Sequence, residues 1–386
     1  MRLLHTADWH VGKTIRGRSR MDEFERVLDE VVEVALDQGV DAVLVAGDLY
    51  ESRVAPPEAD HLVFETFLRL YREGIPVVAI PGNHDSSPRF DALAGLLRVA
   101  GVHVVPRVAR PDRGSVVEAR SRDGKEAAVV ACVPFVPERR FGDAAALFEA
   151  TESWYQDYAQ GMGDLLQAMA GAFRPNRVNV LMAHLFTDGA LLGGGEREVT
   201  TGLEYAVSPA RLPANATYIA LGHIHRPQVV RGSPAPARYP GSLLQLDFGE
   251  RDQKKSVVVV DARPGKPAKV TEIPLRTGRK LVDVHAALAE LPALADGLGD
   301  AYVRVYLAVP GPQPGVAEQV RDIIPNAVDV HLVYERAEDE PDGPPVSSLQ
   351  PEQQFARYHA DRYGAEPDPG LVAAFHEVLA MTGEGG

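Results

Sequence analysis

Cysteine and long apolar runs are scarce in this sequence of 386 residues. Its one cysteine, Cys132, excludes an internal disulfide and a thiolate metal cluster, and its place in the apolar run AVVACVPF predicts a buried, inert thiol. No apolar stretch reaches the roughly 20 residues that span a bilayer. Arg2 is followed by a short strand-like run and then by polar residues, which is not a signal-peptide pattern. We therefore expect a cytoplasmic protein with no membrane partner.

The remaining composition is that of an ordinary globular protein, with 45% apolar and 24% charged residues. The length favours two or three domains, because single cores seldom grow beyond roughly 250–300 residues. The net charge is −14, but it is unevenly distributed. Residues 335–386 carry eleven acidic and three basic side chains, whereas residues 1–20 carry five basic side chains and one acidic. Phosphate binding depends on local Lys and Arg, so overall acidity does not exclude nucleic acid.

Apolar runs of β type alternate with amphipathic helices over the first 260 residues, which predicts an α/β fold with helices packed on sheet faces. Helices are expected over 22–38 and 57–73, and two sheets between helices would accommodate the further strands. From about residue 270, the runs VTEIPL, AYVRVYLAV and VDVHLVY predict strands, with helices near 281–291 and 315–324. These elements indicate a small β-α-β-α-β unit.

The C-terminal part reads as a broken, acidic, Pro-rich linker followed by two helices over 351–363 and 370–382. We divide the chain into domains at 1–269 and 270–334, a linker at 335–350 and a helical segment at 351–386. Apolar side chains at helical spacing predict a partner-docking stripe formed by Phe355, Tyr358, Leu371, Phe375, Val378 and Leu379. Packing of these helices on the chain's own first domain is the alternative.

Five polar clusters each follow the end of a predicted strand, and they hold five of the twelve histidines. The clusters are Asp8-Trp9-His10, Gly47-Asp48, Gly82-Asn83-His84-Asp85, His184, and Gly222-His223-Ile224-His225. Ligands of open α/β sheets collect beyond the carboxyl ends of the strands, so we expect all five clusters to form one site.

The residue types in these clusters suit divalent metals. Asp and Asn supply oxygen and His supplies nitrogen, a mixture that favours manganese, iron or zinc over calcium. Asp8 and His10 are two residues apart on a predicted extended strand, and would therefore point to one side, as would His223 and His225. Taken alone, the first cluster could be a surface turn, and the last could be two edge histidines. The five clusters in this order indicate a metal site.

This order of motifs resembles the signature of the calcineurin-like metallophosphoesterases: D-x-H, G-D, G-N-H-D, a lone H and G-H-x-H. The sequence is most similar to the SbcD branch of that superfamily, through the runs HTADWHVGK, VAGDLYES, IPGNHDS, AHLFTDG, YIALGHIHRPQ and YPGSLLQLDFGE. The resemblance extends through residue 250. It implies a four-layer αββα metallophosphoesterase sandwich, a small α/β cap domain and a C-terminal helical tail.

The resemblance also implies roles for single residues. One metal would be held by Asp8, His10, Asp48 and His225, and the second by Asp48, Asn83, His184 and His223. His84 matches the catalytic histidine of the family, and Asp85 would orient His84 or its loop. Archaeal and eukaryotic relatives carry a second histidine shortly after the G-D motif. This chain has Glu51 there, so the role of that histidine does not carry over.

The implied activity is two-metal hydrolysis of phosphodiesters in DNA, with Mn²⁺ favoured and Mg²⁺, Fe²⁺ or Zn²⁺ as alternatives. Such nucleases act as 3′→5′ exonucleases, cut hairpin or blocked ends, and form a homodimer that joins two copies of the SbcC ATPase. The basic side chains after the first motif are expected to contact the DNA backbone, with a solvated loop as the alternative: Lys13, Arg16, Arg18 and Arg20. Two rival functions are a small-molecule or cyclic-nucleotide phosphodiesterase and a non-catalytic scaffold.

Overall fold

The computed structural model describes residues 1–148, 157–196, 205–311, 313–334, 349–363 and 366–383. The chain divides into two compact units, Met1–Val333 and Tyr334–Gly386, which are described separately. The predicted acidic linker at 335–350 lies almost wholly outside the described residues.

The first unit is built on two six-stranded sheets. In the first sheet the strand order is β12-β11-β1-β2-β3-β4. Strands β1 to β4 are parallel, with Leu4 opposite Val43, and β11 and β12 are antiparallel additions. The bounds of these strands are Arg2–Thr6 (β1), Ala42–Ala46 (β2), Val77–Ile80 (β3), Val102–Val104 (β4), Ser256–Arg263 (β11) and Lys266–Pro274 (β12).

The second sheet has the order β5-β6-β7-β8-β10-β9. Its central strands β6, β7 and β8 are parallel and fully buried, as expected for strands covered on both faces. The bounds are Val116–Arg120 (β5), Ala127–Val133 (β6), Val178–His184 (β7), Tyr218–Gly222 (β8), Gln228–Val229 (β9) and Ala237–Tyr239 (β10).

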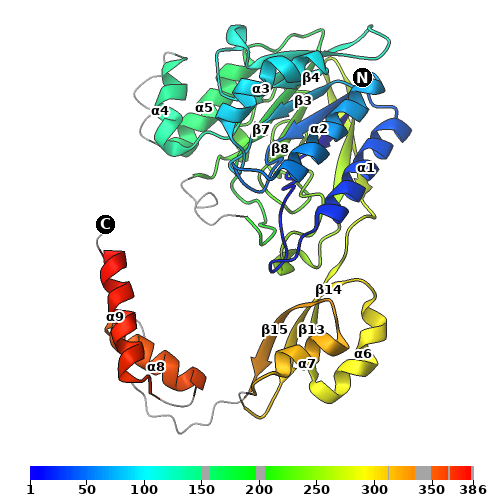
Figure 1. Ribbon diagram of the computed structural model, residues 1–386. Coiled ribbons are helices and arrows are strands. Elements are labelled where there is room, and N and C mark those ends of the chain that lie inside the picture. The colour runs from blue at the N-terminus through cyan, green and yellow to red at the C-terminus, as the bar shows by residue number, and fades with distance from the viewer. Residues whose placement is uncertain (149–156, 197–204, 312, 335–348, 364–365, 384–386) are drawn as a thin grey trace. The chain divides into compact units, whose positions relative to one another are not determined.

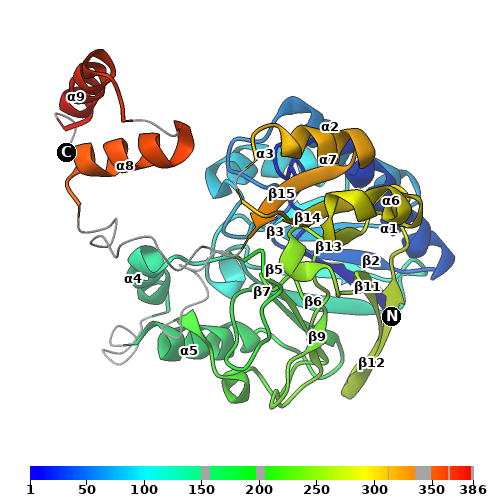
Figure 2. The ribbon, with the colours of Figure 1, turned by 90° about the horizontal axis from the view of Figure 1, so that it is seen from below.

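Helices cover the outer face of each sheet, and the predicted four-layer αββα sandwich is confirmed (Figures 1 and 2). A core containing Cys132 and Met182 lies between the two sheets. The helices packed on the first sheet are α1 (Met21–Asp37), α2 (Pro57–Arg72) and α3 (Ser87–Val99), and those on the second are α4 (Glu138–Ala146) and α5 (Tyr158–Ala170).

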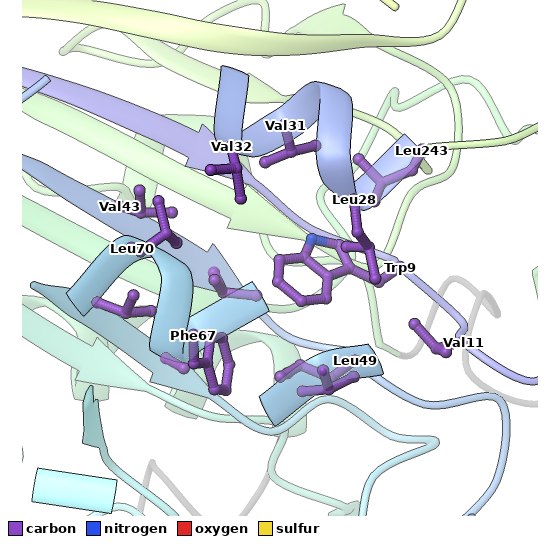
Figure 3. Close-up of a cluster of buried hydrophobic side chains, with 14 of the residues drawn as sticks. Trp9, Val11, Leu28, Val31, Val32, Val43, Leu49, Phe67, Leu70 and Leu243 are labelled. Carbon is purple, nitrogen blue, oxygen red and sulfur yellow. The ribbon is translucent and has the colours of Figure 1, made fainter. Parts of the chain in front are cut away.

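Trp9 anchors the first polar cluster in the outer core. Its ring is fully buried between α1 and α2, 5.9 Å from the ring of Phe67 (Figure 3). Its indole nitrogen donates a hydrogen bond to Thr6 Oγ1 at 2.9 Å. A large buried aromatic side chain fixes the backbone on either side of it. The residues before and after Trp9, Asp8 and His10, are therefore held in place from the hydrophobic side.

A third sheet, of three parallel strands, follows the two large ones. It consists of β13 (Leu281–Ala287), β14 (Tyr302–Ala308) and β15 (Ala327–Val333), with α6 (Leu291–Leu298) and α7 (Val316–Ile323) packed on one face. The helix predicted near 281–291 is therefore wrong over its first part. Apolar and polar residues alternate in LVDVHAA, which is the period of a strand. The run VTEIPL, except its last residue Leu275, lies in β12 and completes the first large sheet instead.

The second unit contains the two predicted C-terminal helices, α8 (Pro351–Tyr363) and α9 (Pro369–Gly383). The rings of Phe355 and Phe375 stack on each other, with centroids 4.2 Å apart and planes 7° apart. These two predicted partner-binding residues therefore contact each other, while Tyr358, Leu371 and Val378 are exposed and Leu379 is half-buried. In the described part of the chain no helix has the length and apolar character needed to cross a membrane.

Candidate metal centre

The five polar clusters meet beyond the carboxyl ends of β1, β2 and β3 in one sheet and of β7 and β8 in the other. Three groups of side chains have ligand atoms within 4.8 Å of one another: Asp8, His10 and His225; His10, Asp48 and His84; and Asp48, His184 and His223. All of these side chains are buried. The structure thus brings together the residues that the sequence singles out.

The backbone reaches this arrangement in a different way from the one predicted. Asp8 and His10 do not lie on an extended strand, because β1 ends at Thr6 and both residues have φ near +50°. Asp48 and His223 also have positive φ, so four of the five such non-glycine residues in the described chain belong to the centre. This conformation costs about 1–3 kcal/mol per residue and persists where surrounding contacts enforce it. The strain is thus concentrated at the centre.

Hydrogen bonds between the clusters enforce these conformations. The backbone N–H of Asp8 donates to Gly47 O, and that of His10 donates to Asp48 O, each at 3.0 Å. From the other sheet, the backbone N–H of His223 donates to Asp8 Oδ1 at 2.9 Å. The loops of both sheets are therefore tied to each other as well as to their own strands.

Glycines let these loops approach within van der Waals contact. A Cβ atom on Gly47 would lie 2.1 Å from His184 Nδ1, and one on Gly82 would lie 2.2 Å from Asp48 Oδ1. A Cβ on Gly222 would lie 1.8 Å from the carbonyl oxygen of Ala46. No side chain fits at such distances, so the three glycines are required for the spacing of the centre.

Asp48 lies at the middle of the cluster and belongs to two of the three donor groups. Its Oδ2 is 3.3 Å from His184 Nε2 and 3.6 Å from His10 Nε2, and its Oδ1 accepts a hydrogen bond from the backbone N–H of His84 at 2.8 Å. Burial opposes ionisation, but the adjacent His184 imidazole holds the pKa of Asp48 well below its usual value. Asp48 is therefore a charged carboxylate that faces donors on both sides.

Asn83 has a similar place between two imidazoles. Its Oδ1 lies 3.0 Å from His184 Nε2 and 2.9 Å from His223 Nδ1. The ring of His184 is fixed from behind, because its Nδ1 lies 2.8 Å from the carbonyl oxygen of Ala46. Together with Asp48, these side chains offer oxygen and nitrogen ligand atoms to a common point.

The donor set fits divalent cations. His10 Nε2 is buried and makes no hydrogen bond within the described part of the chain, so the hydrogen-bonding capacity of this ligand atom is unsatisfied. Burial raises the pKa of Asp8 above its usual value, as expected for a carboxylate whose charge lacks enough compensation. A cation would satisfy both groups, and carboxylate, amide and imidazole ligands are those of manganese, iron and zinc sites.

His84 and Asp85 lie at the edge of this cluster. The ring of His84 is 4.6 Å from that of His10, and its Nδ1 donates a hydrogen bond to the carbonyl oxygen of Glu51 at 2.7 Å. Asp85 accepts hydrogen bonds from the backbone N–H groups of Leu49, Tyr50 and Gly82. Asp85 thus ties the loop that carries His84 to the loop that carries Asp48, and these bonds do not involve the His84 ring.

The basic side chains after the first motif are not all available to DNA. Lys13 pairs with Glu51 at 2.9 Å, and Arg16 pairs with Asp329 of β15 at 2.7 Å. Arg18 donates to the carbonyl oxygen of Pro325 at 2.7 Å. Arg20 is only 1% exposed, so the prediction that it contacts DNA is wrong.

Arg20 instead joins the large domain to the three-stranded sheet. Its guanidinium donates to both carboxylate oxygens of Glu23, at 3.0 and 2.8 Å, and lies 5.6 Å from the ring centroid of Tyr302. The sequence held one signal that could have predicted this pair. A basic residue stands three positions before a glutamate at the start of a helix.

Replacing Arg20 with alanine is expected to lower the free energy of unfolding by about 3–5 kcal/mol, because Glu23 would remain buried without its counter-charge. Denaturant titration would measure the change. Arg26→Ala is the matched control, since Arg26 forms an exposed pair with Asp22 in the same helix and should change stability by less than about 0.5 kcal/mol. Equal effects of the two changes would contradict a buried pair.

Sequence reasoning missed a second charged pair, next to His225. Glu250 Oε1 lies 2.9 Å from His225 Nδ1, and Lys255 Nζ lies 2.7 Å from Glu250 Oε2. Both charged side chains are buried. The signal was present in the run LDFGE and in the lysine pair before the apolar strand KKSVVVV.

Comparisons with known proteins show the family of this chain. The family model of calcineurin-like phosphoesterases matches residues 1–227. The SbcD component of the SbcCD nuclease of Bacillus subtilis is 31% identical over 392 residues, covering 100% of this chain and 99% of that protein. The proteins of the same name from Rhodobacter capsulatus and Escherichia coli K12 are each 31% identical, covering 81% and 76% of this chain and 81% and 73% of their own lengths. The chain therefore belongs to the calcineurin-like phosphoesterases, and within them to the SbcD family of nuclease subunits.

Proposed function

We propose that this chain cleaves phosphodiester bonds at DNA ends with two divalent cations, Mn²⁺ being favoured. The observation that carries the proposal is the place of Asp48. This buried carboxylate is shared by two groups of imidazoles. His10 and His84 belong to one group, and His184 and His223 belong to the other. A carboxylate with two oxygens can bind two cations at once, which is the arrangement that two-metal hydrolysis requires.

In this proposal Asp8, His10 and His225 hold one cation, Asn83, His184 and His223 hold the other, and Asp48 bridges them. When bound, the cations would lower the pKa of a water molecule and neutralise phosphate oxygens. His84 would donate a proton or a hydrogen bond to the departing sugar oxygen. Its Nδ1–H bonds to the carbonyl of Glu51, so donation to the leaving oxygen would come from Nε2–H of the protonated imidazolium ring. Asp85 would keep the loop of His84 at its distance from Asp48.

DNA would be contacted by Lys13, Arg16 and Arg18 and by the three-stranded sheet unit, which we propose as the cap. Arg16 pairs with Asp329 in β15 and Arg18 donates to Pro325 just before it, so this basic segment and the cap would form one surface. The names of the relatives, each a component of the SbcCD nuclease, support a nuclease that works in a complex. We extend this to 3′→5′ exonuclease action, to cleavage of hairpin or blocked ends, and to a homodimer joined to an SbcC-type ATPase.

The test is an assay of the purified chain with Mn²⁺ on linear duplex DNA, hairpin DNA and a small phosphodiester, with and without the candidate ATPase. We expect both DNA substrates to be cut, and the ATPase to increase cutting of duplex ends. Cleavage of the small phosphodiester alone, under both conditions, would indicate the small-molecule hydrolase instead. A protein that binds Mn²⁺ and cleaves none of the substrates would overturn the proposal.

Deleting residues 347–386 is expected to leave metal binding and cleavage of the small phosphodiester nearly unchanged, because the two units are separately compact. The deletion should abolish co-purification with the ATPase, since exposed apolar side chains on α8 and α9 are proposed to dock there. The combined change of Tyr358, Leu371 and Val378 to serine should have the same effect with the chain at full length. Undiminished ATPase binding by the truncated chain would contradict the docking role.

A further inference from the structure

Two histidines of the centre are each held by a lysine–glutamate pair. For His10, Nδ1 lies 2.9 Å from Glu51 Oε2, and the other oxygen of Glu51 lies 2.9 Å from Lys13 Nζ. Both oxygens of this carboxylate therefore face a donor. Among side chains, only a carboxylate accepts hydrogen bonds at both terminal atoms. A glutamate is therefore suited to a position between the two donors His10 and Lys13.

His225 has the same arrangement. Its Nδ1 lies 2.9 Å from Glu250 Oε1, while Glu250 Oε2 pairs with Lys255 Nζ at 2.7 Å and accepts from the backbone N–H of Leu246 at 2.9 Å. Lys255 also donates to the carbonyl oxygen of His225 at 2.9 Å. The ring and the backbone of this histidine are thus fixed by the same pair.

On the other side of Asp48, the ring of His184 is supported by an uncharged group. His184 Nδ1 faces the backbone carbonyl of Ala46 at 2.8 Å, whereas the contact of His223 Nδ1 with Asn83 Oδ1 joins two proposed ligand atoms. His10 and His225 therefore differ from His184 in the charge of the group behind the imidazole.

The carboxylate behind His10 also decides which ring nitrogen carries the proton. A neutral imidazole has one N–H, and two carboxylates face this ring: Glu51 at 2.9 Å from Nδ1 and Asp48 at 3.6 Å from Nε2. The shorter contact holds the proton on Nδ1 and leaves the Nε2 lone pair directed at the centre. Without Glu51, the proton would move to Nε2, toward Asp48, and would block the ligand atom.

We infer that Glu51 and Glu250 are positioning residues, which hold His10 and His225 in the Nδ1–H form and thereby set the cation affinity of the Asp8 side of the centre. This inference rests on the proposed function. It also gives a role to Glu51. Glu51 suits a test because its side chain is 29% exposed and can be replaced at little cost in packing. The hydrogen bond from His84 goes to the backbone carbonyl, which every substitution retains, although Glu51 Oε2 also lies 3.9 Å from His84 Nδ1.

The test compares Glu51→Ala and Glu51→Gln with the unaltered chain. The nitrogen NMR shifts of His10 in the metal-free protein report its tautomer, and calorimetric titration with Mn²⁺ reports the affinity of each site. We expect Glu51→Ala to move the His10 proton to Nε2 and to weaken one of two Mn²⁺ equivalents by about 10–100-fold. Glu51→Gln can still accept the Nδ1–H bond when Lys13 turns to solvent, so it should keep the tautomer and most of the affinity.

Glu65→Gln is the control for the loss of one negative charge, because Glu65 forms an exposed pair with Arg72 on α2. It should leave both readouts unchanged. An unchanged tautomer and unchanged affinities in Glu51→Ala, with two Mn²⁺ still bound, would overturn this inference alone. So would a Glu51→Gln variant as weak as Glu51→Ala, since charge rather than positioning would then govern binding. Failure of the unaltered chain to bind Mn²⁺ would instead overturn the proposed function.

Discussion

Replacing Asp48 with alanine is expected to reduce the bound metal from two equivalents per chain to one or none and to abolish hydrolysis. Two divalent cations a few ångströms apart repel strongly, and the carboxylate between them offsets that repulsion. Asp48 is also the group that faces His10 and His184 at once, so its loss affects both proposed positions. Metal analysis and calorimetric titration with Mn²⁺ would measure the change.

Asp48→Asn separates the charge from the hydrogen bond in this experiment. The asparagine can still accept from the backbone N–H of His84, which Asp48 Oδ1 does at 2.8 Å, but it carries no charge. We expect both variants to lose metal, and the asparagine variant to keep the loop of His84 in place. Two Mn²⁺ sites of near-normal affinity in either variant would refute the bridge.

Replacing His84 with alanine is expected to lower the rate of hydrolysis by about 10²–10⁴-fold while two metal equivalents stay bound. His84 is assigned to the leaving oxygen, and the four ligands proposed for each cation do not include it. The prediction discriminates between two roles that the distances alone permit, because His84 also lies within reach of Asp48 and His10 as a third ligand. Metal content measured beside the cleavage rate decides between them.

His103→Ala is the matched control, since His103 is a half-buried histidine of β4 outside the polar clusters. It should change neither the metal content nor the rate. Loss of one metal equivalent in His84→Ala, with His103→Ala normal, would assign His84 to the ligands and not to the leaving group.

The ligand cluster was predictable because each polar motif follows an apolar strand, and the carboxyl ends of parallel strands gather at one edge. The way in which the side chains reach the centre was not predictable. A positive φ at Asp8 or His10 is enforced by hydrogen bonds to Gly47 and Asp48, and these partners lie in the loop that follows another strand, β2. Intrinsic preference at a non-glycine residue disfavours that conformation, so local sequence predicts an extended segment.

The burial of Arg20 likewise could not be predicted from the local sequence. In the sequence, Arg20 belongs to a basic run with Arg16 and Arg18, and nothing local distinguishes the three. Tyr302 and Arg279, which belong to the far end of the chain, cover the pair that Arg20 makes with Glu23. A long-range contact of this kind decides whether the charged side chain of an arginine is solvated or buried.

The position of Cys132 has a practical consequence for spectroscopy. This thiol lies between the two large sheets, and burial raises its pKa far above the usual value, so it will not react with maleimide or methanethiosulfonate reagents in the folded protein. A pair of cysteines introduced at exposed sites, such as Leu96 on α3 and Leu294 on α6, would therefore take paramagnetic labels without removal of the native residue. Dipolar distances between the two labels would then follow movement of the three-stranded sheet relative to the sandwich as DNA is added.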